Sequence, residues 1–187
     1  SSASLAYGKK KAEEMNIENI NWYQADILNL KKNNVMYDVI ESVGVLHHME
    51  DPKKGFDTLS SRLKNDGLMK IGLYSRAFRK TLDSNKDLIK KNIISKDISS
   101  IKKARKLLME KEILNLKDYF LTSPFIDLLM HEQELSFDID ELKLLFEKEF
   151  KFLGFSFSVN NKSKINQLLK DNGLDKSNMN EIDNWKK

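Results

Sequence analysis

The chain has no cysteine among its 187 residues, which excludes disulfides, thiolate zinc sites and cysteine nucleophiles and is compatible with a reducing cytoplasm. Proline is also scarce, with two residues, and Gly8 is the only glycine before Gly44. No apolar run approaches the roughly 20 residues that span a bilayer, and the first residues lack the apolar core of a signal peptide. We therefore expect a soluble, cytoplasmic protein that does not bind a membrane.

The charge of the chain is balanced along its length. Its 32 basic and 28 acidic residues give a net charge of +4 and are mixed throughout the sequence, which is typical of a solvated surface. The densest basic cluster, at residues 102–111, lies on a helical pattern and has no interleaved aromatic residues of the kind that stack on nucleic-acid bases. The composition therefore favours one globular domain over a nucleic-acid binder.

The most informative stretch is residues 37–49, Tyr-Asp-Val-Ile-Glu-Ser-Val-Gly-Val-Leu-His-His-Met. It predicts a buried strand over residues 37–43, a turn at Gly44 and a pair of histidines, His47 and His48. An Asp-Pro helix start follows directly. Ligands of open α/β sheets bind outside the carboxyl ends of the strands. The polar residues after this strand are therefore candidates for a functional site.

Strands and helices alternate on both sides of this stretch. The patterns predict helices at residues 4–15, capped by Ser4, and at residues 52–63, and strands at residues 20–24 and 68–74, the last after an Asn-Asp-Gly turn. Such alternation implies βαβ crossovers and a parallel sheet, so the fold class is α/β.

The second half of the chain is mainly helical. Residues 75–130 show helical patterns and no strand signal, with one long helix beginning at Ser99 or Ser100 and running to Leu114 and a shorter one beginning at Ser123. The spacing of Asp138 and Glu141 predicts a capping box. Beyond it we expect a strand at residues 150–159, a helix at residues 163–172 and a loose, polar C-terminus.

The run Tyr-Asp-Val-Ile-x-Ser-x-Gly-Val-Leu-His-His-Met-x-Asp-Pro resembles the segment around the fourth strand of class I S-adenosylmethionine-dependent methyltransferases, and residues 5–74 continue the resemblance. The resemblance implies a Rossmann-like three-layer α/β/α fold with an incomplete sheet and a helical insertion after the fifth strand. Within one partial domain it implies cofactor-side βα units at residues 1–74, the insertion at 75–134, and a C-terminal helix-strand-helix at 135–187.

The resemblance also implies which residues hold the cofactor, S-adenosyl-L-methionine. Asp26 would accept a hydrogen bond from the adenine amino group, or it would simply cap the turn that follows it. Ala25 and Ile27 would offer backbone groups and apolar contact beside it. The methionine end of the cofactor would lie against the last residues of the 37–43 strand and the turn after it, Glu41, Ser42, Val43, Gly44 and His47.

The two histidines diverge by about 100° on a helical turn, so they are unsuited to one metal ion. One of them is expected to face the cleft while the other packs. His48 is the candidate base for an acceptor proton, although a structural role is an equal alternative for either histidine. His131 and Glu134 would share a helix face and line the substrate side of the pocket. We expect no metal site.

The glycine-rich loop that opens this family's fold is missing. The family's strand order is 3-2-1-4-5-7-6, and the predicted strands correspond to the third, fourth, fifth and sixth, so that only the fourth and fifth would be neighbours. We therefore expect a fragment that needs an N-terminal segment of the same chain, or a sheet that has paired anew. The methyl acceptor is expected to be a small molecule or protein rather than nucleic acid. The alternatives are a catalytically inactive module that binds a protein partner and another Rossmann-like nucleotide enzyme.

Overall fold

The computed structural model describes residues 2–32, 34–93, 95–109, 119–130, 134–157, 161–174 and 180–186. The chain divides into two compact units. The first unit comprises Ser1–Leu46 and Glu50–Ile71, and the second comprises His47–Met49 and Gly72–Lys187. Among the described residues, no helix is both long and apolar enough to cross a bilayer.

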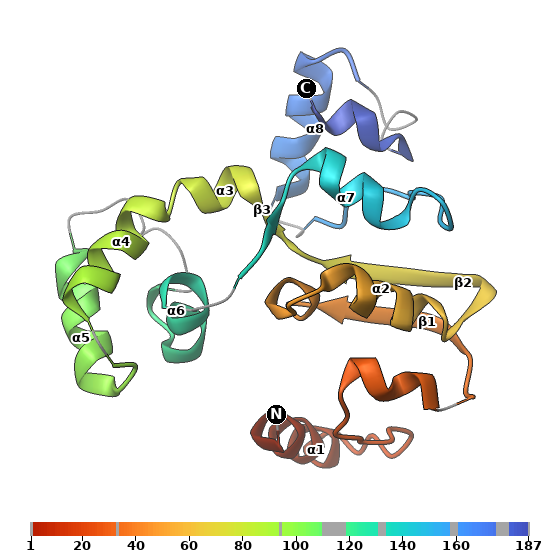
Figure 1. The fold of residues 1–187 in the computed structure, drawn as a ribbon, viewed down its shortest axis with the longest axis horizontal. Helices are drawn as coiled ribbons and strands as arrows, with labels where there is room; N and C mark the ends of the chain where they lie inside the picture. Colours follow the sequence, from red (N-terminus) through yellow and green to blue (C-terminus); the bar gives the residue numbers. More distant parts are fainter. Residues whose placement is uncertain are drawn as a thin grey trace. The chain divides into compact units, whose positions relative to one another are not determined.

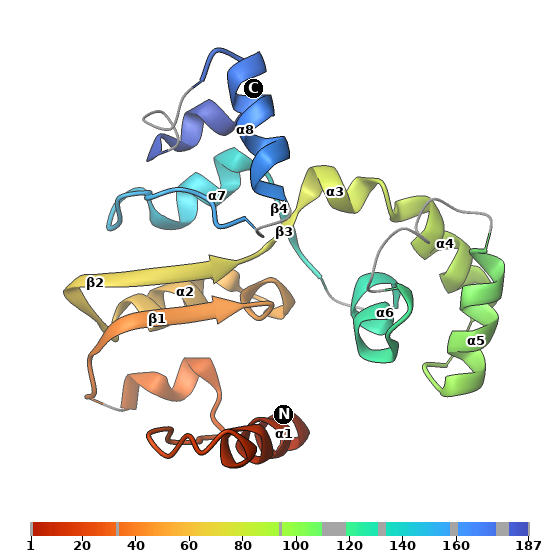
Figure 2. The ribbon, with the colours of Figure 1, turned by 180° about the vertical axis from the view of Figure 1, so that it is seen from behind.

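The first unit is built on one βαβ crossover. Strand β1 (Tyr37–Val43) leads through helix α2 (Pro52–Ser60) to strand β2 (Leu63–Gly72), and the two strands form a two-stranded sheet. Their arrows point the same way, and α2 lies along one face of the pair (Figures 1 and 2). Asp51 caps α2 by accepting a hydrogen bond from the Lys54 amide at 3.0 Å. The predicted pairing of these two strands is confirmed.

Strand β2 begins earlier than the sequence predicts. The Tyr37 amide donates to the carbonyl of Arg62 at 2.8 Å, so contact with β1 starts directly after α2. Leu63, the next residue, is buried in the first unit. The predicted extension of the helix to residue 63 and the predicted turn at residues 65–67 are therefore wrong, because pairing with β1 keeps the Asn-Asp-Gly tripeptide extended.

The N-terminal part of the first unit consists of helix α1 (Ser2–Glu14), an irregular segment and the 3₁₀ helix η1 (Ile27–Lys32). The helix starts before Ser4, so Ser4 is not its cap. Residues 17–26 form no strand, and the predicted strand at residues 20–24 is wrong. Trp22 lies on α1 instead. A Cβ atom on Gly8 would come within 2.9 Å of the indole ring.

The second unit contains a parallel strand pair that the sequence does not predict. Strand β3 (Tyr74–Ser75) pairs with β4 (Ser136–Phe137), with Tyr74 opposite Ser136. Helix α3 (Arg76–Lys80) follows β3 directly. Its first residue, Arg76, donates to the Ser136 carbonyl at 3.0 Å and to the Asp138 carboxylate at 2.9 Å. These bonds join two segments that are far apart in the sequence.

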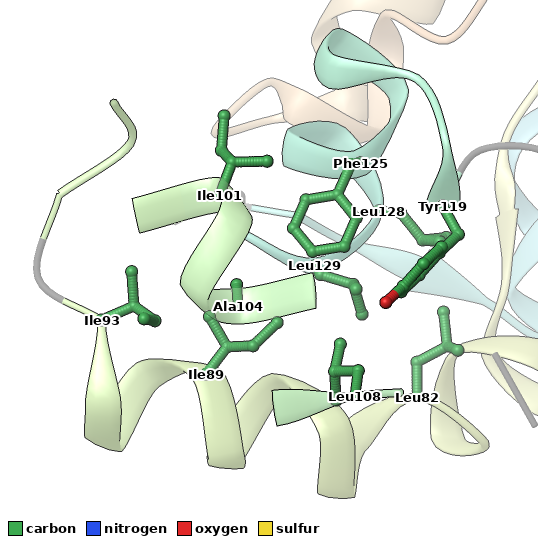
Figure 3. Close-up of a cluster of buried hydrophobic side chains, with 10 residues drawn as sticks. All are labelled: Leu82, Ile89, Ile93, Ile101, Ala104, Leu108, Tyr119, Phe125, Leu128 and Leu129. Atoms are coloured by element: carbon green, nitrogen blue, oxygen red, sulfur yellow. The ribbon is translucent and has the colours of Figure 1, made fainter. Parts of the chain in front are cut away.

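Three further helices form the apolar core of the second unit: α4 (Asp83–Asn92), α5 (Ile98–Leu107) and α6 (Thr122–Leu129). The cap of α5 is Asp97, which accepts from the Ser100 amide, and neither Ser99 nor Ser100 is the cap. The part of the predicted long helix at residues 110–114 lies outside the described residues. Figure 3 shows the buried side chains that these helices and the segments beside them bring together: Leu82, Ile89, Ile93, Ile101, Ala104, Leu108, Tyr119, Phe125, Leu128 and Leu129.

The C-terminal part of the second unit begins with helix α7 (Ile139–Phe146), which has the predicted capping box of Asp138 and Glu141. Helix α8 (Lys162–Asp171) ends before Gly173, whose φ is +67°. Residues 150–157 form no strand, so that prediction is wrong for the described part of the segment. Aromatic side chains pack there instead. The rings of Phe155 and Trp185 meet edge to face at 5.0 Å.

The last described segment is docked rather than loose. The 3₁₀ helix η7 (Ile182–Lys186) is tied to α7 by ion pairs between Lys186 and Asp140 and between Lys143 and Asp183, the latter at 2.7 Å. The charged residues of this segment therefore form ion pairs with α7, and the sequence pattern alone does not predict these pairs.

Candidate functional site

The first group of predicted site residues lies in the first unit, at the carboxyl end of β1. Ser42 is buried, and among the described residues its hydroxyl oxygen has no hydrogen-bond partner. Gly44 has a φ of +75°, and a Cβ atom placed on it would meet nothing within 4 Å. Gly44 is therefore required by its backbone conformation, and the space beside it is open.

The other two predicted residues at this end are exposed. The Glu41 carboxylate forms an ion pair with Lys70 on β2 at 2.8 Å. The side chain of Val43 is exposed as well. Exposed ion pairs contribute little to stability, so the pairing with Lys70 leaves Glu41 able to exchange partners.

Asp26, Ala25 and Ile27 also lie in the first unit, where η1 begins. One oxygen of the Asp26 carboxylate accepts from the Leu28 amide at 2.9 Å, and the Asp26 carbonyl accepts from the Asn29 amide at 3.0 Å. Asp26 thus caps the turn, as the simpler of its two interpretations expects. Contact of Asp26, Ala25 and Ile27 with an adenine ring stays a prediction.

The histidine pair lies in the second unit, on the short 3₁₀ helix η2 (Leu46–His48). His47 is 1% exposed, whereas His48 is half-buried. Their ring centroids are 4.2 Å apart at an angle of 60°. One histidine packs into the protein, as the sequence predicts, while contact of the other with a cleft stays a prediction. His48 is therefore the better candidate for contact with a substrate.

The ring of His47 packs on the ring of Tyr74, with 3.8 Å between the centroids and 32° between the planes. On Tyr74 also lies the guanidinium of Arg79, 3.6 Å from the ring centroid. Burial raises the pKa of the Tyr74 hydroxyl above its usual value of 10.0, so Tyr74 is a neutral phenol at physiological pH. His47, Tyr74 and Arg79 thus form a continuous stack.

The stack ends on a buried ion pair. Arg79 and Glu134 pair directly, and each side chain is 5% exposed. Lys86 approaches the other oxygen of the same carboxylate at 3.3 Å. We call His47, Tyr74, Arg79 and Glu134 the buried column. Glu134 is predicted to line a substrate pocket, and in the structure its carboxylate binds these two cations.

The backbone beside Glu134 closes the column at its other end. The Leu135 amide donates to the carbonyl of His47 at 2.8 Å. The segment that carries Glu134 therefore touches the column at both the arginine and the histidine. His131, the other predicted substrate-side residue, lies outside the described residues.

Sequence patterns missed Arg79 and Lys86 entirely and placed Tyr74 only at the end of a predicted strand. Each residue reads as an ordinary member of a strand or helix, and Lys86 meets Glu134 across 48 residues of chain. An arginine or lysine in a helical stretch is usually a solvated charge, so one sequence holds no signal for such a pairing. The one hint was Glu134, which the sequence singles out for a different reason.

The described residues contain no group of three or more histidine, aspartate or glutamate side chains arranged to hold a metal ion. The chemistry that the described groups can perform is hydrogen bonding, charge pairing, stacking and proton transfer at a half-buried imidazole.

Comparison with known proteins bears on the family of the chain. An uncharacterized protein of Synechococcus sp. (strain ATCC 27144 / PCC 6301 / SAUG 1402/1) is 26% identical over 175 residues, covering 83% of this chain and 41% of the relative. The chain thus spans about two fifths of the length of this relative. A family model described as "Methyltransferase domain" matches residues 1–112. Because this match covers more than half of the chain, the protein belongs to the methyltransferase-domain family of class I, S-adenosylmethionine-dependent enzymes.

Proposed function

We propose that this chain binds S-adenosyl-L-methionine at the carboxyl end of β1 and takes part in transfer of its methyl group to an acceptor. One observation carries the proposal beyond family membership. The buried Ser42 hydroxyl has no partner among the described residues, and open space lies beside the Gly44 backbone two residues later. A buried hydroxyl costs free energy until it is hydrogen-bonded, so a polar ligand at this place would satisfy it.

The residues at this end suit such a ligand. Ser42 can donate to or accept from its amino acid end, and Glu41 can exchange Lys70 for the ligand's ammonium group. Val43 offers exposed apolar surface. The exposed Asp26 carboxylate would accept a hydrogen bond from the adenine amino group, and Ala25 and Ile27 would lie beside the adenine ring. When bound, the cofactor supplies an electrophilic methyl group on a sulfonium sulfur.

For the acceptor we propose a small molecule or a protein side chain that loses a proton as it becomes the nucleophile. We assign the removal of that proton to the half-buried imidazole of His48, because a neutral imidazole nitrogen can accept a proton. Positioning of the two reactants would contribute most of the rate enhancement. This chain covers 41% of the relative, so the methyl acceptor of any longer protein is a proposal as well.

Calorimetric titration with S-adenosylhomocysteine, the product, tests the site directly. We expect a dissociation constant in the micromolar range, loss of binding in Gly44→Val, and weaker binding in Asp26→Ser. Serine retains a hydroxyl that can cap the turn but lacks the second carboxylate oxygen. Asp66→Ala changes an exposed aspartate of the same unit that is not part of the proposed site, and it should bind like the unmodified chain.

A folded chain that releases no heat and shows no product binding by equilibrium dialysis would refute the proposal. It would favour the second candidate, an inactive module that binds a protein partner. The observation in favour of that candidate is the exposed apolar surface of the β1–β2 pair, where Val39, Val43 and Leu68 are all more than half exposed.

A further inference from the structure

The buried column brings together three parts of the chain that sequence patterns treat separately. His47 comes from η2, Tyr74 and Arg79 from β3 and α3, and Glu134 from the residues before β4. The members touch in series. The ring centroids of His47 and Tyr74 are 3.8 Å apart, and the guanidinium carbon of Arg79 lies 3.6 Å from the centroid of Tyr74. Arg79 in turn forms an ion pair with Glu134. All four belong to the second unit.

We propose that Arg79 and Glu134 are positioning residues that hold the His47–His48 pair in the orientation needed for methyl transfer. The inference rests on the function proposed above for that pair. Arg79 acts through Tyr74, and Glu134 acts through Arg79.

The column has the physical properties that this role requires. Arg79 is almost completely buried, so its charge must be paired, and Glu134 is the anion that pairs with it. A flat guanidinium on an aromatic face is attracted to the ring and restricts its tilt. Arg79 also donates to the Leu128 carbonyl at 2.9 Å, which fixes it to helix α6. The guanidinium that contacts the Tyr74 ring is therefore itself fixed in place.

The orientation of His48 depends on the same two rings. The ring centroid of His48 lies 4.2 Å from that of His47 and 6.0 Å from that of Tyr74, and the planes of His48 and Tyr74 meet at 87°. A change in the tilt of the Tyr74 ring would therefore change the orientation of the His48 ring, both by direct contact and through the His47 ring. The hydrogen bond from the Leu135 amide to the His47 carbonyl fixes the backbone of the pair.

The test uses the imidazole signals of the full chain in ¹⁵N-labelled form, because a merely structural ion pair would not control them. The chain has three histidines, and His131→Gln identifies the signals of the one that is not part of the His47–His48 pair. Stacking on Tyr74 should shift the carbon-bound protons of His47 upfield. In Arg79→Met and Glu134→Gln that upfield shift should be lost, and the signals of His48 should move.

Two further variants make the result specific. Arg105 lies over the ring of Phe125 at 5.1 Å and is the matched control, because Arg105→Met removes an arginine stacked on an aromatic ring outside the column. It should leave the signals of His47 and His48 in place. Arg79→Lys keeps the charge without the flat guanidinium, and it should restore folding stability but not the upfield shift. Histidine signals that do not change in folded Arg79→Met, or that lysine fully restores, would overturn the proposal.

The same variants are then titrated with S-adenosylhomocysteine. The product contacts proposed above include neither histidine, so Arg79→Met should bind the product like the unmodified chain. If the unmodified chain does not bind the product, the proposed function fails while the histidine signals still report on the column. If the unmodified chain binds and the histidine signals of Arg79→Met are unchanged, the positioning role fails alone.

Discussion

The ion pair of Arg79 and Glu134 allows a quantitative prediction. Replacing Glu134 by leucine leaves a guanidinium, 5% exposed, with the Leu128 carbonyl and the Tyr74 ring as its remaining contacts among those described. Removal of one partner from a buried ion pair typically costs about 3 to 5 kcal/mol. We therefore expect Glu134→Leu to lower the free energy of unfolding of the second unit by that amount.

Replacing the other partner, Arg79, should lower the free energy of unfolding by less. In Arg79→Met the carboxylate of Glu134 keeps Lys86 at 3.3 Å, so the remaining charge is still paired. We expect a loss of about 1.5 to 3 kcal/mol, the range for a hydrogen bond to a charged group. The double variant removes both charges and should lose less than the sum of the single variants, with a coupling of about 1 kcal/mol or more.

The assay is urea unfolding followed by the fluorescence of Trp185, in a Trp22→Phe background so that the signal reports the second unit alone. Glu147→Leu, an exposed glutamate of the same unit, is the control and should change stability by no more than about 0.5 kcal/mol. If Glu134→Leu costs no more than this control, or if the two single losses simply add, the reasoning from burial and pairing is refuted.

Three further predictions concern local structure. Gly44→Ala should destabilise the first unit by about 1 to 2 kcal/mol through its φ of +75° alone, and Gly44→Asn by less, measured by urea unfolding. Asp138→Ala should cost about 1 kcal/mol and Asp138→Ser much less, because serine also caps a helix. The pKa of Asp183 is lowered to about 2 by hydrogen bonds from Lys143 and Lys186. Because the pKa of Asp183 is lower in the folded state, its ion pairs stabilise the fold at pH values above 3.8, and this stabilisation is lost as the pH falls through about 2. The fluorescence of Trp185 should therefore change near pH 2 in the unmodified chain and change less in Asp183→Asn.

The parts of the fold that the sequence predicted correctly depend on neighbouring residues. The Asp51 cap with Pro52, the capping box of Asp138 and Glu141, and the Gly173 stop are all decided within one helical turn. The pairing of β1 with β2 also follows from local information, because a short crossover brings its two strands together. These elements could be read from the sequence because their partners lie close by in the chain.

The strands at residues 20–24 and 150–157 were predicted incorrectly for the opposite reason. An alternating or aromatic pattern shows that a segment suits a sheet, but a strand also needs a partner with free backbone groups. Trp22 and Phe155 use their apolar surface against Gly8 and Trp185 instead. The buried column could not be predicted for the same reason, because Arg79 and Glu134 are far apart in the sequence and come into contact only in the folded chain.

The bonds from Arg76 to the segment around β4 bear on the biosynthesis of the protein. Arg76 donates to Asp138, 62 residues later in the chain. At about 5 to 20 residues per second, a ribosome needs roughly 3 to 12 seconds to synthesise that interval. During this time α3 to α6 are synthesised while the acidic partners of Arg76 and Arg79 are still missing. The nascent helices thus expose positive charge and apolar surface together, which is the state in which a newly made chain is most open to aggregation and to chaperones.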